Sequence, residues 1–219
     1  MKFSTMSRTW KQLCLLFAFL LTTAHGNNNS SCSSSECTYN QTDKQLQDMK
    51  ICLENKSRTW TEYQKANIFI QLQTLTDIIQ KQQNKEFQTS LPKKCPVPDV
   101  TENGGLLCLS ARKEAYCKPM CNAGYDFNFL RRSRLFEECS SATQDKWTTQ
   151  FIGGSRLAIC DKSDIAVSGA PSAYFPEGQD CQKIKSDEEL MGNITKIFQS
   201  ELVKAGITQS LRFFSLLCG

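Results

Sequence analysis

The number and spacing of cysteines limit what this chain can fold into more than any other feature. Ten of its 12 cysteines fall between residues 32 and 181, and six of these lie within residues 95–160. A stretch this short buries too little apolar surface to be stable alone, so we expect disulfides to compensate. Disulfides persist in oxidising compartments, which indicates an extracellular protein.

The first 26 residues have the order of a secretory signal peptide. Basic residues without any acid precede an apolar run at residues 13–21, and Ala24 and Gly26 then form a small-x-small cleavage site. The apolar run has nine residues, whereas a membrane-spanning helix needs roughly 20. We therefore expect residues 1–26 to be removed and the mature chain to be secreted without a membrane span. A signal anchor is the alternative that this length disfavours.

Removal of the leader reduces the number of functions that the mature chain could have. The formal net charge falls from +4 to +1, so there is no electrostatic case for nucleic acid or anionic membrane as a partner. The single histidine, His25, leaves with the leader, which excludes imidazole-based catalysis and HExxH zinc sites. Acid clusters at residues 137–138 and 187–189 are more typical of solvated faces or helix starts than of catalysis. We predict that the protein is not an enzyme and needs no cofactor or metal.

Asparagine sequons indicate exposed positions that can carry sugar in a secreted chain. Five are present, at Asn28, Asn29, Asn40, Asn55 and Asn193. Residues 27–41 are also polar and of low complexity, so we expect a flexible, glycosylated end.

Residues 42–91 show helical periodicity and predict a helical hairpin. Thr42 and Gln45 fit a capping box at the start of the first helix, and the second helix covers about residues 59–83. A core-facing pair of helices is our first interpretation. A coiled-coil dimer is the alternative that stays open, although the heptad repeat that would form it is short. That repeat comprises Ile68, Leu72, Leu75 and Ile79.

The helical period disappears within residues 95–160, where short apolar segments alternate with glycine turns and indicate a small β module. Residues 161–185 are interpreted as a linker or loop. An amphipathic helix at 186–206 follows, with Ser186 and Glu189 as its capping box. The apolar tail at 207–219 is expected to pack on the core, to bind a partner, or to be a truncated or alternative terminus. The predicted fold class is α+β, a disulfide-rich β module flanked by helices.

The β module resembles a sushi domain, also called a complement control protein module. Cys95 precedes prolines and Asn103-Gly104, Cys121 precedes Gly124-Tyr125, and Trp147 lies between two later cysteines, Cys139 and Cys160. The resemblance implies the pairs Cys95–Cys139 and Cys121–Cys160 and a role in extracellular recognition. Cys108 and Cys117 are additional to the family pattern and are expected to pair with each other.

Outside the module, Cys32, Cys37, Cys52 and Cys181 can pair among themselves, which leaves Cys218 over. An odd cysteine in a secreted protein indicates an intermolecular bridge or a capped thiol, so a disulfide-linked dimer through Cys218 is one expectation.

A basic cluster, Arg131, Arg132 and Arg134, lies in the loop between Cys121 and Cys139. Three interpretations stay open: a solvated loop, a contact for sulfated glycans or an acidic protein, and a convertase-type cleavage site.

These patterns together predict a secreted, glycosylated, disulfide-bonded interaction protein. Its sushi-like module would recognise an extracellular protein or glycan. The alternative is a soluble helical signalling ligand whose helices at residues 42–83 bind a receptor.

Overall fold

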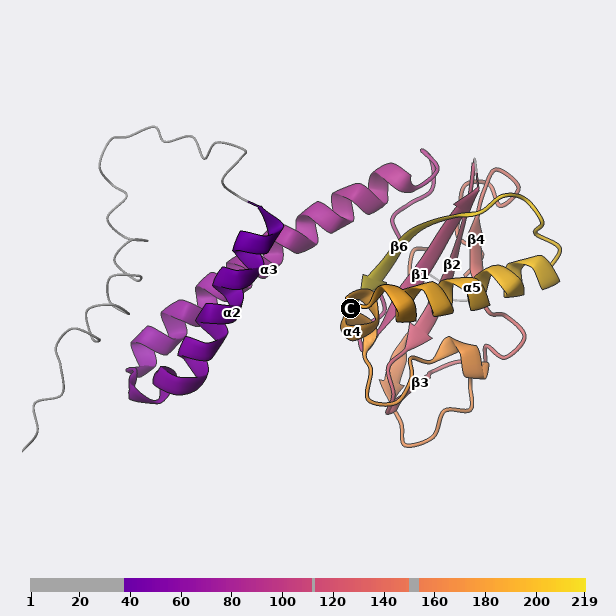
Figure 1. Cartoon of the computed structure of the whole chain (residues 1–219). Coiled ribbons are helices and arrows are strands. Elements are labelled where there is room, and N and C mark those ends of the chain that lie inside the picture. The colour runs from indigo at the N-terminus through magenta and orange to yellow at the C-terminus, as the bar shows by residue number, and fades with distance from the viewer. Residues whose placement is uncertain (1–37, 112, 150–153) are drawn as a thin grey trace, which may run out of the picture. The chain divides into compact units, whose positions relative to one another are not determined.

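The computed structural model describes residues 38–111, 113–149 and 154–219 (Figure 1). The chain is a mixed α+β protein with two compact units, Met1–Gln71 and Leu72–Gly219. The predicted fold class is confirmed in this coarse form. The leader, Asn28, Asn29, Cys32 and Cys37 lie outside the described residues.

The first unit contains helix α2, Tyr39–Lys56, the short 3₁₀ turn η1, Ser57–Thr59, and the start of helix α3, Glu62–Ser90. The short turn reverses the chain, so α3 starts antiparallel to α2 (Figure 1). The two predicted helices are therefore present, and α3 extends past the predicted end at residue 83.

The start of α2 differs from the prediction. Thr38, not Thr42, is the N-cap: its hydroxyl accepts from the Gln41 amide, and the Gln41 side chain accepts from the Thr38 amide. Residues 38–41 and 42–45 both read Thr-x-x-Gln, and the earlier box satisfies the first amides of the helix. Thr42 lies inside the helix, where its hydroxyl donates to the Thr38 carbonyl.

A four-stranded antiparallel sheet forms the centre of the second unit. Its order is β4-β2-β1-β6, and its strands are β1, Gly104–Ala111, β2, Glu114–Cys121, β4, Glu137–Cys139, and β6, Arg212–Cys218. The apolar tail is therefore strand β6, paired with β1. A small second sheet joins β3, Tyr125–Phe127, to β5, Cys160–Lys162. The larger sheet therefore combines three strands of the predicted β module, residues 95–160, with strand β6 from the end of the chain.

Both faces of the larger sheet are covered. Leu107 and Leu109 of β1 pack with Phe198 and Leu202 of helix α5, Glu188–Lys204, which crosses one face (Figure 1). On the other face, Leu106 packs in a separate core, whose other members include Phe87, Leu91, Trp147 and Leu157. Seven of the eight residues of β1 are consequently buried, and the strand lacks the alternation of a half-exposed strand.

The segment predicted as a linker is ordered in the structure. Besides β5 it contains a 3₁₀ turn, η2, Pro171–Ala173, and helix α4, Cys181–Lys185. The predicted capping box of the last helix is wrong, because Ser186 ends α4 and Asp187 caps α5. The Asp187 carboxylate accepts from the amides of Glu189 and Leu190, where the helix dipole favours a negative charge.

Four disulfides cross-link the second unit. Two of them are the pairs that the sushi resemblance implies, Cys95–Cys139 and Cys121–Cys160, and a third is the expected Cys108–Cys117. The fourth, Cys181–Cys218, corrects two predictions. Cys181 does not pair with Cys32, Cys37 or Cys52, and Cys218 is not left over for a dimer. The physical reason is β6, which returns the end of the chain to the sheet beside α4.

Candidate interaction surface

Arg131, the first member of the arginine cluster, is part of the core and not of the surface. Arg131 exposes only 2% of its area, and its Nη1 donates to Glu137 Oε1 at 3.0 Å and to the Leu157 carbonyl at 3.1 Å. Arg134 Nη2 donates to the second oxygen of Glu137, Oε2, at 2.8 Å. Glu137 also accepts from the Thr148 hydroxyl. This network fastens the loop at residues 128–136 to the body.

The network overturns the three interpretations of the cluster for Arg131. A solvated loop, a glycan contact and a cleavage site all require an exposed guanidinium, and that of Arg131 is bound inside. Arg134 is partly exposed but is engaged by Glu137. Arg132 is the exposed arginine of this loop, and a lone exposed arginine is a weak glycan site.

A second buried ion pair joins the sheet to its covering helix. Lys118 Nζ of β2 lies 2.6 Å from Glu201 Oε2 of α5, and both side chains are largely buried. Burial lowers the pKa of Lys118, and the hydrogen bond and charge of Glu201 oppose that shift. The pair positions α5 on the sheet.

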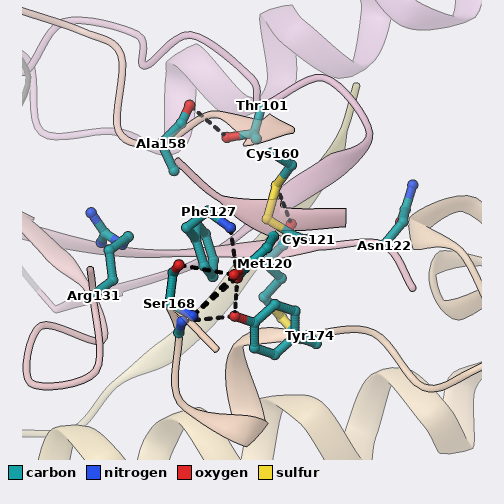
Figure 2. The surroundings of a disulfide bond; sticks show 12 residues. Thr101, Met120, Cys121, Asn122, Phe127, Arg131, Ala158, Cys160, Ser168 and Tyr174 are labelled. Carbon is teal, nitrogen blue, oxygen red and sulfur yellow. Dashed lines mark hydrogen bonds between the residues drawn. A yellow bond between two sulfur atoms is a disulfide. The ribbon is translucent and has the colours of Figure 1, made fainter. Parts of the chain in front are cut away.

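Asp126 of β3 organises the loop that follows β5. It accepts hydrogen bonds from the Val167 amide, from the Ser168 amide and hydroxyl, and from the Tyr174 hydroxyl. Figure 2 shows Ser168 and Tyr174 beside the Cys121–Cys160 disulfide. Burial raises the pKa of Asp126, but these hydrogen bonds outweigh burial and the net pKa is lowered. Burial and the hydrogen bond to Asp126 raise the pKa of Tyr174 to about 12.

The acid clusters also have structural partners. Glu137 belongs to the arginine network, Glu138 accepts from the Ser140 hydroxyl at 2.6 Å, and Asp187 caps α5. Within residues 38–111, 113–149 and 154–219, no group of three or more His, Cys, Asp or Glu residues could hold a metal ion. None of the helices in these ranges is both long and apolar enough to cross a bilayer.

A groove of about 460 Å³ lies in the second unit. Its walls come from α3, with Lys81 and Lys85, and from residues 97–100, with Leu217 at one end. Cations, amides, a carboxylate and apolar groups are mixed along it, so its lining does not select one ligand chemistry.

The first unit presents a very different surface. We call its described residues, 38–71, the hairpin. No residue of the hairpin is buried. Several of its large apolar side chains are instead exposed by between 46% and 81%; they include Tyr39, Leu46, Ile51, Tyr63 and Phe69. In the second unit, by contrast, apolar side chains fill two cores on either side of the sheet and a third beneath the small sheet.

The predicted core-facing stripe of the hairpin is therefore not a core. Leu46 is exposed, and Met49 and Leu53 are only half-buried. Two helices offer each other one face and provide no third element to cover the contact between them. Large apolar side chains that no other element covers can mark an interaction site in a soluble protein.

The described sequons occupy exposed positions. Asn40 and Asn55 are on α2, and Asn193 is on α5. Exposure permits glycosylation, and the attached sugar stays a prediction.

No family model, curated protein or solved structure matches the chain. The sushi resemblance and the function inferred from it therefore stay predictions.

Two functional features of the chain escaped sequence reasoning. One is the buried ion pair of Arg131. Its sequence signal is Glu137, an acidic residue six positions further along the chain. The other is the exposure of large apolar side chains on the hairpin. Its sequence signal is the spread of apolar residues around α3, since Phe69 lies about 100° around the helix from Ile68.

Proposed function

We propose that the chain is a secreted, disulfide-stabilised interaction protein that recognises another extracellular protein through its hairpin. The observation that carries this proposal is the exposure of large apolar side chains on the hairpin, residues 38–71, in which no residue is buried. The proposal corresponds to the alternative that the sequence leaves open, a soluble signalling ligand whose helices at residues 42–83 bind a receptor. The four disulfides support an oxidising compartment.

Charge favours a protein over a glycan as the partner. The hairpin carries five basic and four acidic residues, so its net charge is +1. A sulfated glycan needs a concentrated basic patch, and Arg131, the most central candidate for one, is buried. An apolar, nearly neutral surface matches an apolar protein surface.

Recognition by the sushi-like stretch, residues 95–160, is a second candidate. The pairs Cys95–Cys139 and Cys121–Cys160 favour it, because they are the pairs that the resemblance implies. Its strands β1 and β2 are covered on both faces, so a binding surface there would use loops such as the one holding Leu130, which is 71% exposed.

One experiment separates the two candidates. The full chain is expressed in a secretory eukaryotic host, purified from the medium, fluorescently labelled and titrated onto cells of the tissue that expresses it. Phe69→Glu alters the hairpin, Leu130→Glu alters the sushi-like stretch, and Ile165→Glu is the matched control in a different loop. The three side chains have similar exposed fractions, 61%, 71% and 66%.

We expect saturable binding that Phe69→Glu weakens at least about tenfold, while the other two variants bind as the unmodified chain does. Loss of binding in Leu130→Glu alone would favour the sushi-like stretch. Absence of the chain from the medium, or binding that does not saturate, would refute the proposed function.

A further inference from the structure

We propose that the hairpin binds the hairpin of a second copy of this chain, so that two hairpins form a four-helix bundle. This inference names a partner for the hairpin and in that sense rests on the proposed function. The contact surface is the seam, defined as Tyr39, Leu46, Met49 and Leu53 of α2 with Ile68 of α3.

The seam is a continuous stripe on α2. Its members follow one another at intervals of seven, three and four residues, the spacing of positions that face a partner helix. Although the stripe faces one direction, Tyr39 and Leu46 are exposed and Met49 and Leu53 are half-buried. The packing of α2 on α3 therefore leaves the seam open. A second pair of helices is the arrangement that closes such a seam in a bundle.

The segment that directly precedes the hairpin has little apolar surface with which to cover the seam. The eleven residues that precede Thr38 in the expected mature chain, 27–37, are asparagine, serine, glutamate and cysteine. Such a segment offers almost no apolar surface.

The charges of the hairpin also favour a second copy. Acidic and basic residues are interspersed, and the net charge of +1 gives little repulsion between two identical hairpins. A surface evolved for a strongly charged partner would carry a single sign of charge.

The sequons leave the seam accessible. Asn55 lies nine residues from Leu46, which places it about 180° around α2, and Asn40 lies about 120° from Leu46. Sugar on either residue would project away from the proposed contact.

The size of the seam sets the strength of the contact. α2 is about 27 Å long, and the hairpin part of α3 about 15 Å. With a width of roughly 10 Å each, the face is on the order of 400 Å² per copy, or about 800 Å² for the pair, which is below the roughly 1,200–2,000 Å² of stable interfaces and in the range of weak, transient ones. We therefore expect a reversible dimer with a Kd in the micromolar range.

The test uses the secreted full chain and two substitutions on one helix. Leu46→Glu alters the seam, and Ile51→Glu is its matched control about 140° around α2. Their exposed fractions, 46% and 56%, are similar, and glutamate is a good helix former, so both variants should fold. Sedimentation equilibrium from about 1 to 100 µM gives Kd, circular dichroism verifies helicity, and a non-reducing gel identifies covalent dimers.

We expect Leu46→Glu to raise Kd at least about 30-fold and Ile51→Glu to change it less than about threefold. A chain that stays monomeric at the highest concentration would overturn the inference. So would equal effects of the two substitutions, or a covalent dimer that survives Leu46→Glu. If the chain does not dimerise but binds cells in a way that Phe69→Glu weakens, the inference is wrong and the proposed function is retained. If the chain dimerises through the seam but does not bind cells, the proposed function is wrong and self-association is retained.

Discussion

At the scale of single residues, polar side chains of the second unit act as internal ties. Arg131, Lys118 and Asp126 are buried, and each has a partner that fastens one element to another. A charged residue in a low-dielectric interior is tolerated only with such a partner, because desolvation is costly. Substitution of one partner should therefore affect stability more than recognition.

The ion pair of Arg131 with Glu137 gives the first prediction. Arg131→Ala leaves the Glu137 carboxylate without its most buried partner, so we expect a loss of about 3–5 kcal/mol in the free energy of unfolding. Urea denaturation followed by fluorescence measures this loss. Arg132→Ala, at the exposed neighbour, should stay within about 0.5 kcal/mol. Equal effects of the two substitutions would contradict the buried network.

Asp126 gives a prediction on pH. Its pKa in the folded protein lies below the value of the unfolded chain, so its contribution to stability is present above pH of about 4 and is lost as the pH falls through the folded pKa. Asp126→Asn removes this dependence. We expect the variant to be less stable than the unmodified chain at pH 7. As the pH falls below about 5, the variant should lose less stability than the unmodified chain does. Urea denaturation at several pH values measures both differences. Parallel pH profiles of the two proteins would contradict the assignment.

At the scale of elements, strand β6 completes the sheet. Its antiparallel pairing places Leu216 opposite Leu107 and the Cys181–Cys218 bridge beside Gly105, where a Cβ would lie 2.5 Å from the Cys181 sulfur. A fragment that ends at residue 160 therefore lacks both a neighbour of β1 and one covering helix.

The Cys181–Cys218 bridge gives the third prediction. It closes 37 residues of chain, so replacing both cysteines with serine should cost about 3–4 kcal/mol in the free energy of unfolding, chiefly by releasing the unfolded chain. Guanidinium denaturation measures this cost, and peptide mapping under non-reducing conditions should recover the bridge itself. A map that joins Cys218 to a second chain would contradict the structure.

Local patterns predicted the helices well and the sheet poorly. Helical spacing located α2, α3 and α5, because each signal lies within one segment. The pairing of β6 with β1 joins residues more than a hundred positions apart, and no local pattern contains that information. Burial of β1 on both faces also removes the alternation by which a strand is recognised.

The site was predictable only in part. The sequence indicates the helices as an alternative recognition element, but it predicts that their apolar stripe faces a core. Periodicity shows which side chains share a face but not whether another element covers that face. Leu46 illustrates this, since its spacing is that of a core residue and its exposed fraction is that of a surface residue.

At the scale of the whole molecule, the two units differ in how they obtain stability. The second unit has apolar cores on both faces of its main sheet and four disulfides. The hairpin contains no buried residue, whereas helices in proteins obtain most of their stability from the packing of an apolar face. We therefore expect the stability of the hairpin to depend on a bound partner.

Hydrogen exchange of the full chain, followed by mass spectrometry at about 1 and 100 µM, measures that dependence. We expect amides of β1 and β2 to be protected at both concentrations. Amides of the hairpin should exchange rapidly at the low concentration and slow down at the high one, and Leu46→Glu should abolish this slowing. A hairpin as well protected as the sheet at both concentrations, in the unmodified chain and in Leu46→Glu alike, would contradict the account.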